Sequence, residues 1–481
     1  MAKVLLLSPP YLDIYGKFKN AAGRYFPLGI GYIASYLIKY GGHEVRLYEP
    51  EAQALTIDSI TTIIKDFGPD IVGITCSTAN FTRAAGLARL CRENSKAKII
   101  MGGVHVSAVP EYVISEYGEC IDCVVVGEGE ITMLELIDAY ARSSGLEAVK
   151  GTVYKSEGAI VHGEGRPYIE DLDSIPFPAR HLIPQHIFFP NMHNARYKNC
   201  LTMLTSRGCP FNCSFCASRI VSGTRYRVHS AEYVLDEMQM LKIDYNARQL
   251  IITDDTFTFD LPRLEKICKG MIDKKMRLAW FCFAHVNTVN REILHLMKEA
   301  GCCSIGFGLE SSDEQVLKRM GKPISPARAR EIVRIANRLG LKTQAFYILG
   351  SPCETKQQML DTIKFSREVD STLAFYNMLV PFPGTRDFKY FFSSTPLKDI
   401  DWGKFVAIGQ DCVLKNSEVS PRQIEMLIGK ANTIYYANPR RLLNLLLHIR
   451  TFYEFGNYFQ GGLALFKQVT KWFGGKAKRG E

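Results

Sequence analysis

Three cysteines within eight residues form the densest group of reactive side chains in the sequence. Cys209, Cys213 and Cys216 lie in the segment SRGCPFNCSFC, residues 206–216. Thiolates are soft ligands that favour an iron–sulfur cluster or zinc. A closed structural site takes four protein ligands, so three leave one metal position open for a reacting molecule. The spacing therefore predicts a catalytic metal centre, and the alternative is three cysteines that only pack in a core.

The remaining cysteines form no second group of this kind. They are Cys76, Cys91, Cys120, Cys123, Cys200, Cys268, Cys282, Cys302, Cys303, Cys353 and Cys412. Cys120 and Cys123 have CxxC spacing, but they flank the start of an apolar segment, which favours a place in the core. We expect one metal centre.

Two further polar residues follow predicted strands. His285 comes directly after an apolar run at 278–283, where a titratable ring would lie near the substrate. Its alternatives are packing or exposure to solvent. Asp254 follows the run 249–253 and could contact a cofactor or the substrate; with Asp255 it forms a carboxylate pair, but nothing nearby in the sequence completes a divalent-metal site.

The elements that must position these residues alternate between strands and helices. Helical patterns such as 231–241 and 327–339 separate the predicted strands, which are 201–205, 249–253, 278–283, 303–308, 343–349 and 372–378. Six such units predict a partial (β/α)6 barrel, whose working face is the carboxyl end of the strands. The three cysteines follow its first strand.

The first 142 residues contain an earlier series of the same kind. Helical patterns at 27–40 and 82–93 lie between five predicted strands, at 3–8, 44–48, 70–76, 98–101 and 122–126. This α/β pattern predicts a flavodoxin-like (Rossmann-type) domain, in which ligands bind outside the carboxyl ends of the strands. The candidate contacts there are Ser8, Tyr11, Ser77, Gly102, Gly103, His105, Gly127 and Glu128.

We divide the chain into four parts: a first domain at 1–150, a linker at 151–198, the barrel at 199–390, and a helical region at 391–481. The linker has scattered glycines and prolines and little periodicity. From residue 439 onward the chain has eight basic residues against two acidic ones, with aliphatic and aromatic residues between them. This end either lies on an anionic membrane surface or packs on the barrel.

Composition narrows the function further. The chain has 481 residues, 47% of them hydrophobic and 22% charged, as in an ordinary folded protein. The net charge of +10 is small for this length, so nucleic acid is not an expected partner. The N-terminus has no signal-peptide pattern and no apolar run is long enough to span a membrane. We expect a cytoplasmic protein, with peripheral contact at the inner membrane face as an open alternative.

At the cysteine triplet the chain resembles the radical S-adenosylmethionine superfamily. The signature CxxxCxxC has an aromatic residue before its last cysteine, here Phe215. The resemblance implies a 4Fe-4S cluster on Cys209, Cys213 and Cys216, with S-adenosylmethionine on the fourth iron. It also implies that Glu310 and Ser311, in the segment GFGLES, lie near the ribose, and that Gly350 and Glu354 lie near the adenine.

The first domain resembles the cobalamin-binding domain of one large branch of this superfamily. That fold carries an Asp-x-His-x-x-Gly element after its first strand, where this chain has Asp13-Ile14-Tyr15-Gly16 and no histidine. A histidine ligand to cobalt from this loop is therefore excluded. The resemblance covers residues 1 to about 390.

The resemblance implies an enzyme that cleaves S-adenosylmethionine with one electron and removes hydrogen from an unactivated carbon of a small-molecule substrate. Cobalamin would supply a methyl group, and the apolar, basic C-terminus favours a lipid-like or tetrapyrrole-like substrate. A flavodoxin or ferredoxin is the expected electron donor. Two alternatives stay open: a radical cyclase or rearrangement enzyme without methyl transfer, and a cobalamin or metal sensor.

Overall fold

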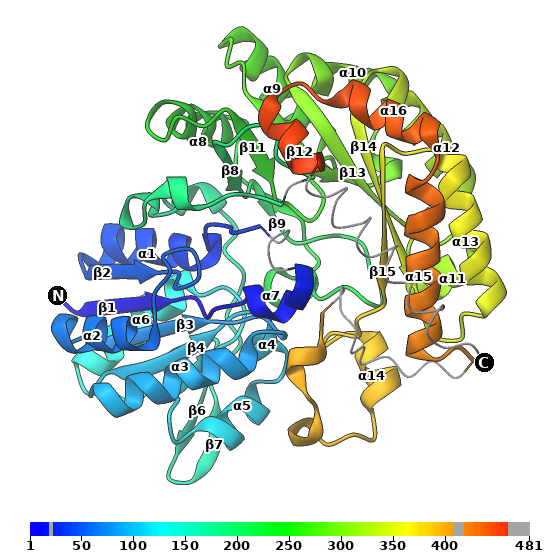
Figure 1. Ribbon diagram of the computed structural model, residues 1–481. Coiled ribbons are helices and arrows are strands. Elements are labelled where there is room, and N and C mark those ends of the chain that lie inside the picture. The colour runs from blue at the N-terminus through cyan, green and yellow to red at the C-terminus, as the bar shows by residue number, and fades with distance from the viewer. Residues whose placement is uncertain (19–22, 192, 407–417, 460–481) are drawn as a thin grey trace.

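The computed structural model describes residues 1–18, 23–191, 193–406 and 418–459 as two α/β units joined side by side (Figure 1). The first contains a seven-stranded sheet. In spatial order its strands are β2 (Glu44–Tyr48), β1 (Lys3–Leu7), β3 (Ile71–Thr75), β4 (Lys98–Gly102), β5 (Cys123–Val125), β6 (Thr152–Ser156) and β7 (Ala159–His162). The first five are parallel, in the order 2-1-3-4-5 typical of flavodoxin-like domains. The predicted strands and fold of this unit are confirmed.

Helices cover both faces of this sheet. They are α1 (Leu28–Gly41), α2 (Ile57–Phe67), α3 (Phe81–Asn94), α4 (Val104–Ala108), α5 (Pro110–Tyr117) and α6 (Glu130–Ala141). Thr56 caps α2 through a hydrogen bond from the backbone N–H of Ser59, and Gly42 ends α1 in the left-handed conformation. The strands β1, β3, β4 and β5 present apolar side chains to both helix layers, which is why they are largely continuous apolar runs in the sequence.

The structure differs from prediction at the start of the linker. Residues 152–162 form the hairpin β6–β7, which pairs antiparallel with β5 and extends the first sheet. Side chains on β7 are largely exposed, so the strand lacks the apolar alternation that marks a strand in sequence. Beyond it, the segment up to Asn199 contains three short 3-10 helices, Leu172–Ser174, Arg180–Leu182 and Gln185–Ile187.

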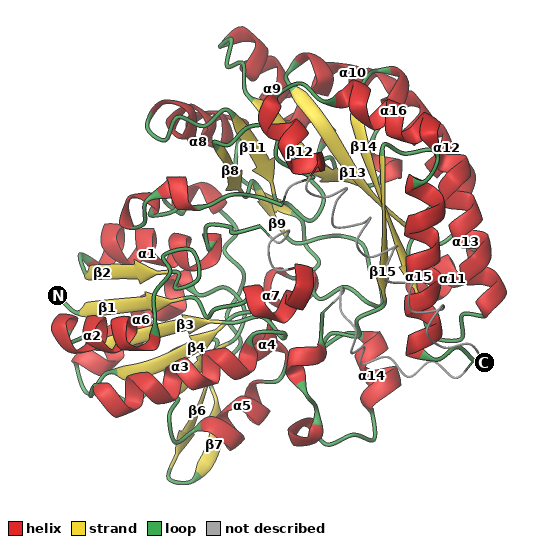
Figure 2. Ribbon diagram, in the orientation of Figure 1, coloured by secondary structure: helices red, strands yellow, loops and turns green. Residues whose placement is uncertain are grey.

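The second unit is an open barrel of six parallel strands. Their spatial order is β15 (Leu373–Met378), β14 (Lys342–Leu349), β13 (Cys302–Glu310), β12 (Ala279–Ala284), β11 (Gln249–Ile252) and β8 (Cys200–Met203). The helices outside it are α8 (Ala231–Ile243), α9 (Leu261–Asp273), α10 (Arg291–Glu299), α11 (Glu314–Met320), α12 (Pro326–Arg338) and α13 (Lys356–Val369), as Figure 2 shows. All six predicted strands are present, and the partial barrel is confirmed.

A small ribbon connects the barrel to the first unit. The strands β9 (Ser206–Arg207) and β10 (Arg227–Val228) pair antiparallel. Between them lie the cysteine segment and the short helix α7 (Ser218–Ser222). The cysteine loop is therefore held at both ends.

After the barrel the chain returns to the first unit and then to the barrel. Helix α14 (Arg386–Phe392) and the 3-10 helices Leu397–Asp399 and Trp402–Lys404 share a hydrophobic core with α3 and α4. Helix α15 (Pro421–Tyr436) then packs on β15, and α16 (Pro439–His448) follows it. None of the helices within the described ranges is both long and apolar enough to cross a membrane.

Candidate functional site

The cysteine loop lies beyond the carboxyl end of β8 and is clamped by the rest of the barrel. The Ser214 N–H donates to the Met320 carbonyl (2.7 Å), and the Asp387 N–H donates to the Ser214 carbonyl (3.2 Å). Gly208 has φ +85°, and a Cβ there would lie 2.2 Å from the Arg225 carbonyl oxygen. Glycine is thus required at this position.

The three thiols of this loop are half-buried and free of disulfides. The Cys209 Sγ lies 3.7 Å from Thr256 Oγ1, and the Cys216 Sγ lies 3.2 Å from Ser218 Oγ. Burial raises the pKa of the Cys213 thiol to about 11, although the Lys322 ammonium acts in the opposite direction.

No group of three His, Cys, Asp or Glu side chains in the described ranges is arranged to hold a single metal ion. Each cysteine of an iron–sulfur cluster binds a different iron, so cluster ligands are spaced more widely than the ligands of one ion. Three free thiols in one loop therefore fit a cluster better than a lone zinc ion.

Lys322 was not singled out by the sequence, and the structure brings it to this loop. Its Nζ donates to Glu310 Oε1 at 3.1 Å, and both side chains are buried. Burial lowers the pKa of Lys322, but the Glu310 carboxylate and Cys213 raise it by more than burial lowers it. The net pKa is raised, so the lysine stays charged. A lone lysine after a helix-ending glycine carries no motif that could have revealed this.

Glu310 ends β13 with φ +59°, a conformation that is uncommon for a residue with a side chain. The pairing of β13 with β14 is irregular between Gly308 and Glu310. The strained backbone and the buried ion pair hold the carboxylate at the carboxyl edge of the barrel, where the sequence predicted a ribose contact.

Ser311 does not share this environment. Its hydroxyl lies 3.2 Å from Thr362 Oγ1 of α13 and accepts a hydrogen bond from the Asp313 N–H. The side chain is buried between β13 and α13, so the structure does not support the predicted cofactor contact.

Gly350 and Glu354 form one loop after β14. The Gly350 and Ser351 N–H groups both donate to Glu354 Oε2, at 2.8 and 2.9 Å. Burial raises the pKa of Glu354 to about 7. Glu354 therefore shapes the loop by binding its backbone, while Gly350, with φ +91°, permits the turn.

Phe215 of the cysteine loop packs against the barrel core.

His285 follows β12 and is 4% exposed. Its ring stacks on Phe211 of the cysteine loop, with centroids 4.1 Å apart and planes at 18°. The Nδ1 atom accepts a hydrogen bond from the Asn287 N–H (3.2 Å), whereas Nε2 has no partner within the described chain. Burial and Lys322 lower the pKa of His285 to about 3, so the ring is neutral.

Asp254 is buried at the end of β11 and holds the segment before the cysteines. It accepts hydrogen bonds from the Thr205 N–H and hydroxyl, both at 2.6 Å, and from the Ser206 hydroxyl at 2.5 Å. Burial raises its pKa, while these donors oppose the shift. Both carboxylate oxygens of Asp254 are occupied by these hydrogen bonds. This arrangement suits a residue that positions Thr205 and Ser206 better than one that contacts the substrate.

The carboxyl edge of the first sheet contains most of the predicted loop contacts. Ser8 follows β1, and its N–H donates to the Tyr48 carbonyl; the Tyr11 hydroxyl donates to the Gly23 carbonyl (3.0 Å). Ser77 is exposed after β3. Gly102 has only Val125 near the position of a Cβ, whereas a Cβ on Gly103 would lie 2.3 Å from the Cys76 carbonyl oxygen.

His105 requires a correction. The sequence predicts a loop residue that contacts the ligand, but α4 begins directly after Gly103 and directs the ring into the core. The ring is fully buried, 4.2 Å from the Phe81 ring and 4.7 Å from the Trp402 ring, and neither nitrogen has a hydrogen-bond partner in the described chain. His105 is therefore a packing residue and does not face a ligand.

Glu128 also differs from its expected role. Its carboxylate accepts hydrogen bonds from Arg207 (3.1 Å), from both terminal nitrogens of Arg227 (2.8 and 3.0 Å) and from the Ile169 N–H (2.9 Å). Glu130 binds Arg207 at 2.6 Å. These buried pairs join the first sheet to the β9–β10 ribbon, so Glu128 has no oxygen left for a ligand and the predicted cofactor contact is not supported.

The two carboxyl edges meet next to the cysteine loop. Helix α7 begins two residues after Cys216 and contacts α4, which begins two residues after the end of β4. A Cβ on Gly384 would lie 2.7 Å from Ile220 of α7 and 3.3 Å from Ala108 of α4. Gly127 has φ +85°, and its N–H donates to Ser107 Oγ of α4 (3.0 Å).

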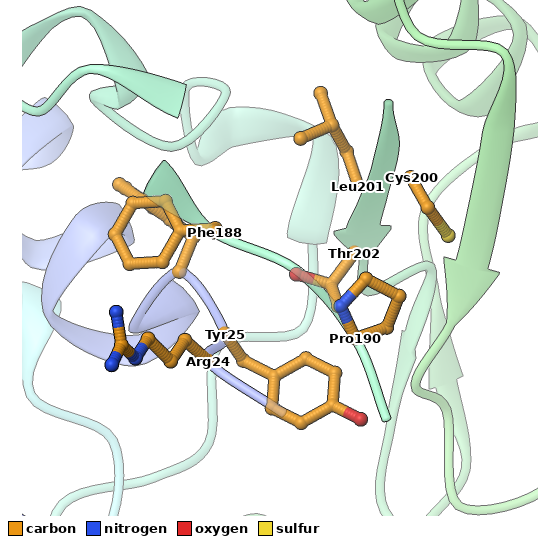
Figure 3. A pocket seen from close by; sticks show the side chains of 8 residues that line it. Arg24, Tyr25, Phe188, Pro190, Cys200, Leu201 and Thr202 are labelled. Atoms are coloured by element: carbon orange, nitrogen blue, oxygen red, sulfur yellow. The ribbon is translucent and has the colours of Figure 1, made fainter. Parts of the chain in front are cut away.

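A small cavity of about 10 Å³ lies elsewhere, at the amino end of β8. Arg24, Tyr25, Phe26, Phe188, Pro190, Cys200, Leu201 and Thr202 line it (Figure 3). This volume is near the minimum for one water molecule, and the site is at the opposite end of the strand from the cysteines. It is therefore not a candidate for a cofactor or substrate.

Comparison with known proteins identifies both units. Residues 203–366 match the family model described as the radical SAM superfamily, and residues 18–137 match the model described as the B12 binding domain. Among solved structures, the cobalamin-dependent S-adenosylmethionine radical enzyme OxsB is similar with a TM-score of 0.70 and 18% identity. That similarity covers 95% of this chain and 72% of OxsB.

Among sequences, a protein of Pyrococcus horikoshii named as an uncharacterized methyltransferase is 35% identical over 442 residues, 92% of this chain and 94% of that protein. The anaerobic magnesium-protoporphyrin IX monomethyl ester cyclase of Rubrivivax gelatinosus is 27% identical, over 79% of this chain and 68% of its own. The chain belongs to the radical S-adenosylmethionine enzymes that carry an N-terminal cobalamin-binding domain.

Proposed function

We propose that this enzyme transfers a methyl group to an unactivated carbon of a small-molecule substrate. The observation that carries the proposal is the contact of α4 with α7, which joins the carboxyl edge of the cobalamin-binding unit to the cysteine loop. Ligands of both units would then approach one substrate. The identity to a relative named as a methyltransferase supports the same reaction.

We infer that Cys209, Cys213 and Cys216 are the ligands of a 4Fe-4S cluster. When bound, the cluster with S-adenosylmethionine supplies one-electron chemistry that removes hydrogen from carbon, and cobalamin supplies the methyl group. The chain's task is to orient these groups. Glu310 suits a ribose because a carboxylate accepts hydrogen bonds from two hydroxyls, and Lys322 holds that carboxylate in place.

His285 is proposed to contact the cofactor or the substrate. Since Nδ1 accepts a hydrogen bond from the Asn287 N–H, the proton of the neutral ring is assigned to Nε2. A buried N–H without a partner is costly, and a ligand beside the cysteine loop would satisfy it. Asp254 is proposed as a positioning residue, because it acts through Thr205 and Ser206.

On the cobalamin side, Ser77 and Gly102 are the proposed contacts, with Ser8, Tyr11 and Gly127 at the same edge. The exposure of Ser77 and the open space beside Gly102 support this assignment. A lipid-like or tetrapyrrole-like substrate is proposed from relatives named for such molecules, including a hopanoid C-3 methylase of Methylococcus capsulatus at 24% identity. A flavodoxin or ferredoxin is proposed as reductant.

The test uses anaerobically reconstituted full-length protein with cobalamin and methyl-labelled S-adenosylmethionine. Without substrate, we expect 5'-deoxyadenosine from uncoupled cleavage. With lipid or tetrapyrrole fractions, we expect label in a product together with 5'-deoxyadenosine and S-adenosylhomocysteine. Two S-adenosylmethionine molecules should be consumed per methyl group, one yielding each by-product.

The control is the variant in which Cys209, Cys213 and Cys216 are all replaced by Ala; it should lose iron, sulfide and 5'-deoxyadenosine formation. Replacement of Cys120, which precedes β5 in the first unit, by Ala is the control and should retain all three. An altered substrate without label or S-adenosylhomocysteine would favour cyclisation or rearrangement, which the named cyclase relative makes the second candidate. Cobalamin binding without 5'-deoxyadenosine would indicate a sensor.

A further inference from the structure

Helix α16 buries a charged side chain and exposes apolar ones. Its one buried side chain is Arg441, whose Nε donates to Asp370 Oδ1 (3.0 Å) and whose Nη2 donates to the Arg367 carbonyl (2.6 Å). Four of the five leucines of the same helix are exposed to solvent, among them Leu443 (58%) and Leu447 (62%). A helix of a water-soluble fold normally does the reverse, which indicates that this apolar face has a partner.

The next helical segment, residues 452–459, also exposes apolar side chains. The exposed apolar residues of the two segments are Leu442, Leu443, Leu446, Leu447, Phe452, Phe455 and Phe459, and we call this set the C-terminal apolar face. Phe452 is 98% exposed. Elsewhere the exposed large apolar residues of the described chain are scattered, so this grouping within eighteen positions is unusual.

Buried polar contacts fix this segment to the barrel. Glu454 is fully buried and accepts a hydrogen bond from Lys342 Nζ (3.1 Å), and that nitrogen also donates to the Tyr458 hydroxyl (3.0 Å). Thr451 Oγ1 donates to the Arg196 carbonyl (2.5 Å). The segment that carries the exposed leucines and phenylalanines is therefore fixed to the barrel by buried hydrogen bonds.

The segment 439–459, which carries the C-terminal apolar face, is basic. Glu454 is the one acidic residue between 439 and 459, and its contact with Lys342 removes it from the surface. Arg440 and Arg450 are exposed. We propose that the C-terminal apolar face binds the surface of an anionic lipid membrane.

Charge distinguishes this partner from a second copy of the chain. Self-association through the face would bring exposed arginines of like charge together, whereas anionic lipid headgroups attract them. Leucine and phenylalanine side chains can insert at the boundary between headgroups and acyl chains, with the arginines at the headgroup level. The observations therefore favour a membrane.

The position of the face also assigns its role. Lys342, the first residue of β14, holds Glu454, so the segment lies at the amino end of the barrel strands. The cysteine loop lies beyond the opposite, carboxyl end. Membrane binding here would anchor the enzyme without delivering substrate directly to the reactive edge, and the inference is independent of the proposed methyl transfer.

The test measures binding of the full-length protein to vesicles by flotation. The vesicles contain phosphatidylcholine alone or phosphatidylcholine with phosphatidylglycerol. We expect binding to the anionic vesicles only, weakened at about 0.5 M salt because screening then acts within a few ångströms. Replacement of Leu446 and Leu447 by Glu should reduce the partition coefficient at least about tenfold, since each change removes apolar insertion and adds repulsion.

The matched control replaces two other exposed apolar residues by Glu. These are Ile57 on α2 and Ile243 on α8, which are exposed to a similar degree (68% and 64%). This control should bind like the natural chain. Arg440→Glu provides a second variant that alters no buried contact, and it should weaken binding at low salt. Equal binding to neutral vesicles, or unchanged binding of the leucine variant, would overturn the proposal. It would also be overturned if the protein bound no vesicles. In that case, a dimer in light scattering that the leucine variant converts to a monomer would identify the face as a contact between two copies of the chain.

Discussion

At the scale of single residues, Lys322 brings a buried positive charge to the cysteine loop. It pairs with Glu310 and lies close enough to Cys213 to affect the pKa of that thiol. A buried cation in this position both holds the carboxylate and offsets the negative charge of thiolates. Its removal should therefore weaken cofactor binding and, because Glu310 loses a buried partner, also lower the stability of the fold.

We predict that Lys322→Met weakens S-adenosylmethionine binding to reconstituted protein by about 10- to 100-fold, the equivalent of one charge-assisted hydrogen bond of about 1.5–3 kcal/mol. Lys322→Arg should restore part of the affinity because it keeps the charge. Equilibrium dialysis with labelled S-adenosylmethionine measures the effect. Lys318→Met, on the exposed side of α11, is the control; equal affinities of the two Met variants would contradict the assignment.

The sequence predicted residues whose partners are close in the chain and missed those whose partners are distant. The three cysteines were recognisable because their ligand spacing is local. Lys322 and Arg207 were not, because each acquires its role from carboxylates that only the fold brings near. Glu128 was assigned to a ligand for the same reason: its arginine partners are 79 and 99 residues away.

At the scale of elements, the β9–β10 ribbon is the link between the two units. Arg207 binds Glu128 and Glu130, Arg227 binds Glu128, and all four side chains are buried. Arg207 stands two residues before Cys209, so the ion pairs also fix the start of the cysteine loop. Loss of one partner would leave a buried charge uncompensated.

We predict that Arg207→Met lowers the free energy of unfolding by about 3–5 kcal/mol, because Glu128 and Glu130 lose a buried partner. Iron incorporation should also fall, since the cysteine loop loses its anchor. Arg225→Met is the matched control: Arg225 pairs with Glu170 at the surface, where such a pair contributes about 1 kcal/mol or less. Chemical denaturation and iron analysis would separate the variants, and equal stability would refute the structural role.

The loop after β1 carries a second prediction at this scale. Residues 8–16 contain no histidine, and His105 is enclosed by Phe81 and Trp402. We therefore predict that bound cobalamin has no protein imidazole on cobalt from these elements. Electron paramagnetic resonance of the cobalt(II) form should lack nitrogen superhyperfine coupling from a protein histidine. A nitrogen splitting that changes from three lines to two when the protein is labelled with 15N-histidine would contradict the prediction.

Strands buried on both faces could be predicted, whereas an exposed hairpin could not. All eleven parallel strands of the two sheets coincide with predicted strands, and most of them are apolar runs; the edge strand β2 alternates between buried and exposed positions instead. The hairpin β6–β7 was missed because β7 is mostly exposed and its pairing with β6, not burial, keeps it extended. Backbone pairing of this kind leaves little pattern in the side chains.

At the scale of the whole molecule, residues 386–405 connect the end of the barrel to the first unit. Phe388 and Trp402 belong to the same core as Phe81 of α3, and Trp402 Nε1 donates to the Tyr112 hydroxyl (3.3 Å). His105 lies within this contact, between Phe81 and Trp402. The docking of the post-barrel segment thus depends on a neutral imidazole.

This dependence predicts acid sensitivity. Burial lowers the pKa of His105 to about 3, against about 6.5 for an unperturbed histidine. Below about pH 6.5 the unfolded chain binds a proton that the folded chain does not, so stability falls as the pH falls towards 3. The loss is at most about 1.4 kcal/mol per pH unit, or roughly 2 kcal/mol at pH 5.

We predict that His105→Leu removes this contribution and makes the unfolding free energy less dependent on pH between 6.5 and 5. At neutral pH the variant should be at least as stable as the natural chain, because neither ring nitrogen has a hydrogen-bond partner that the leucine would lose. Urea denaturation at both pH values measures the difference, with His181→Leu, an exposed position, as control. If the His105 variant retained the full loss of stability in acid, the ring would not be the group that titrates, and the link between its neutrality and the docking of residues 386–405 would be rejected.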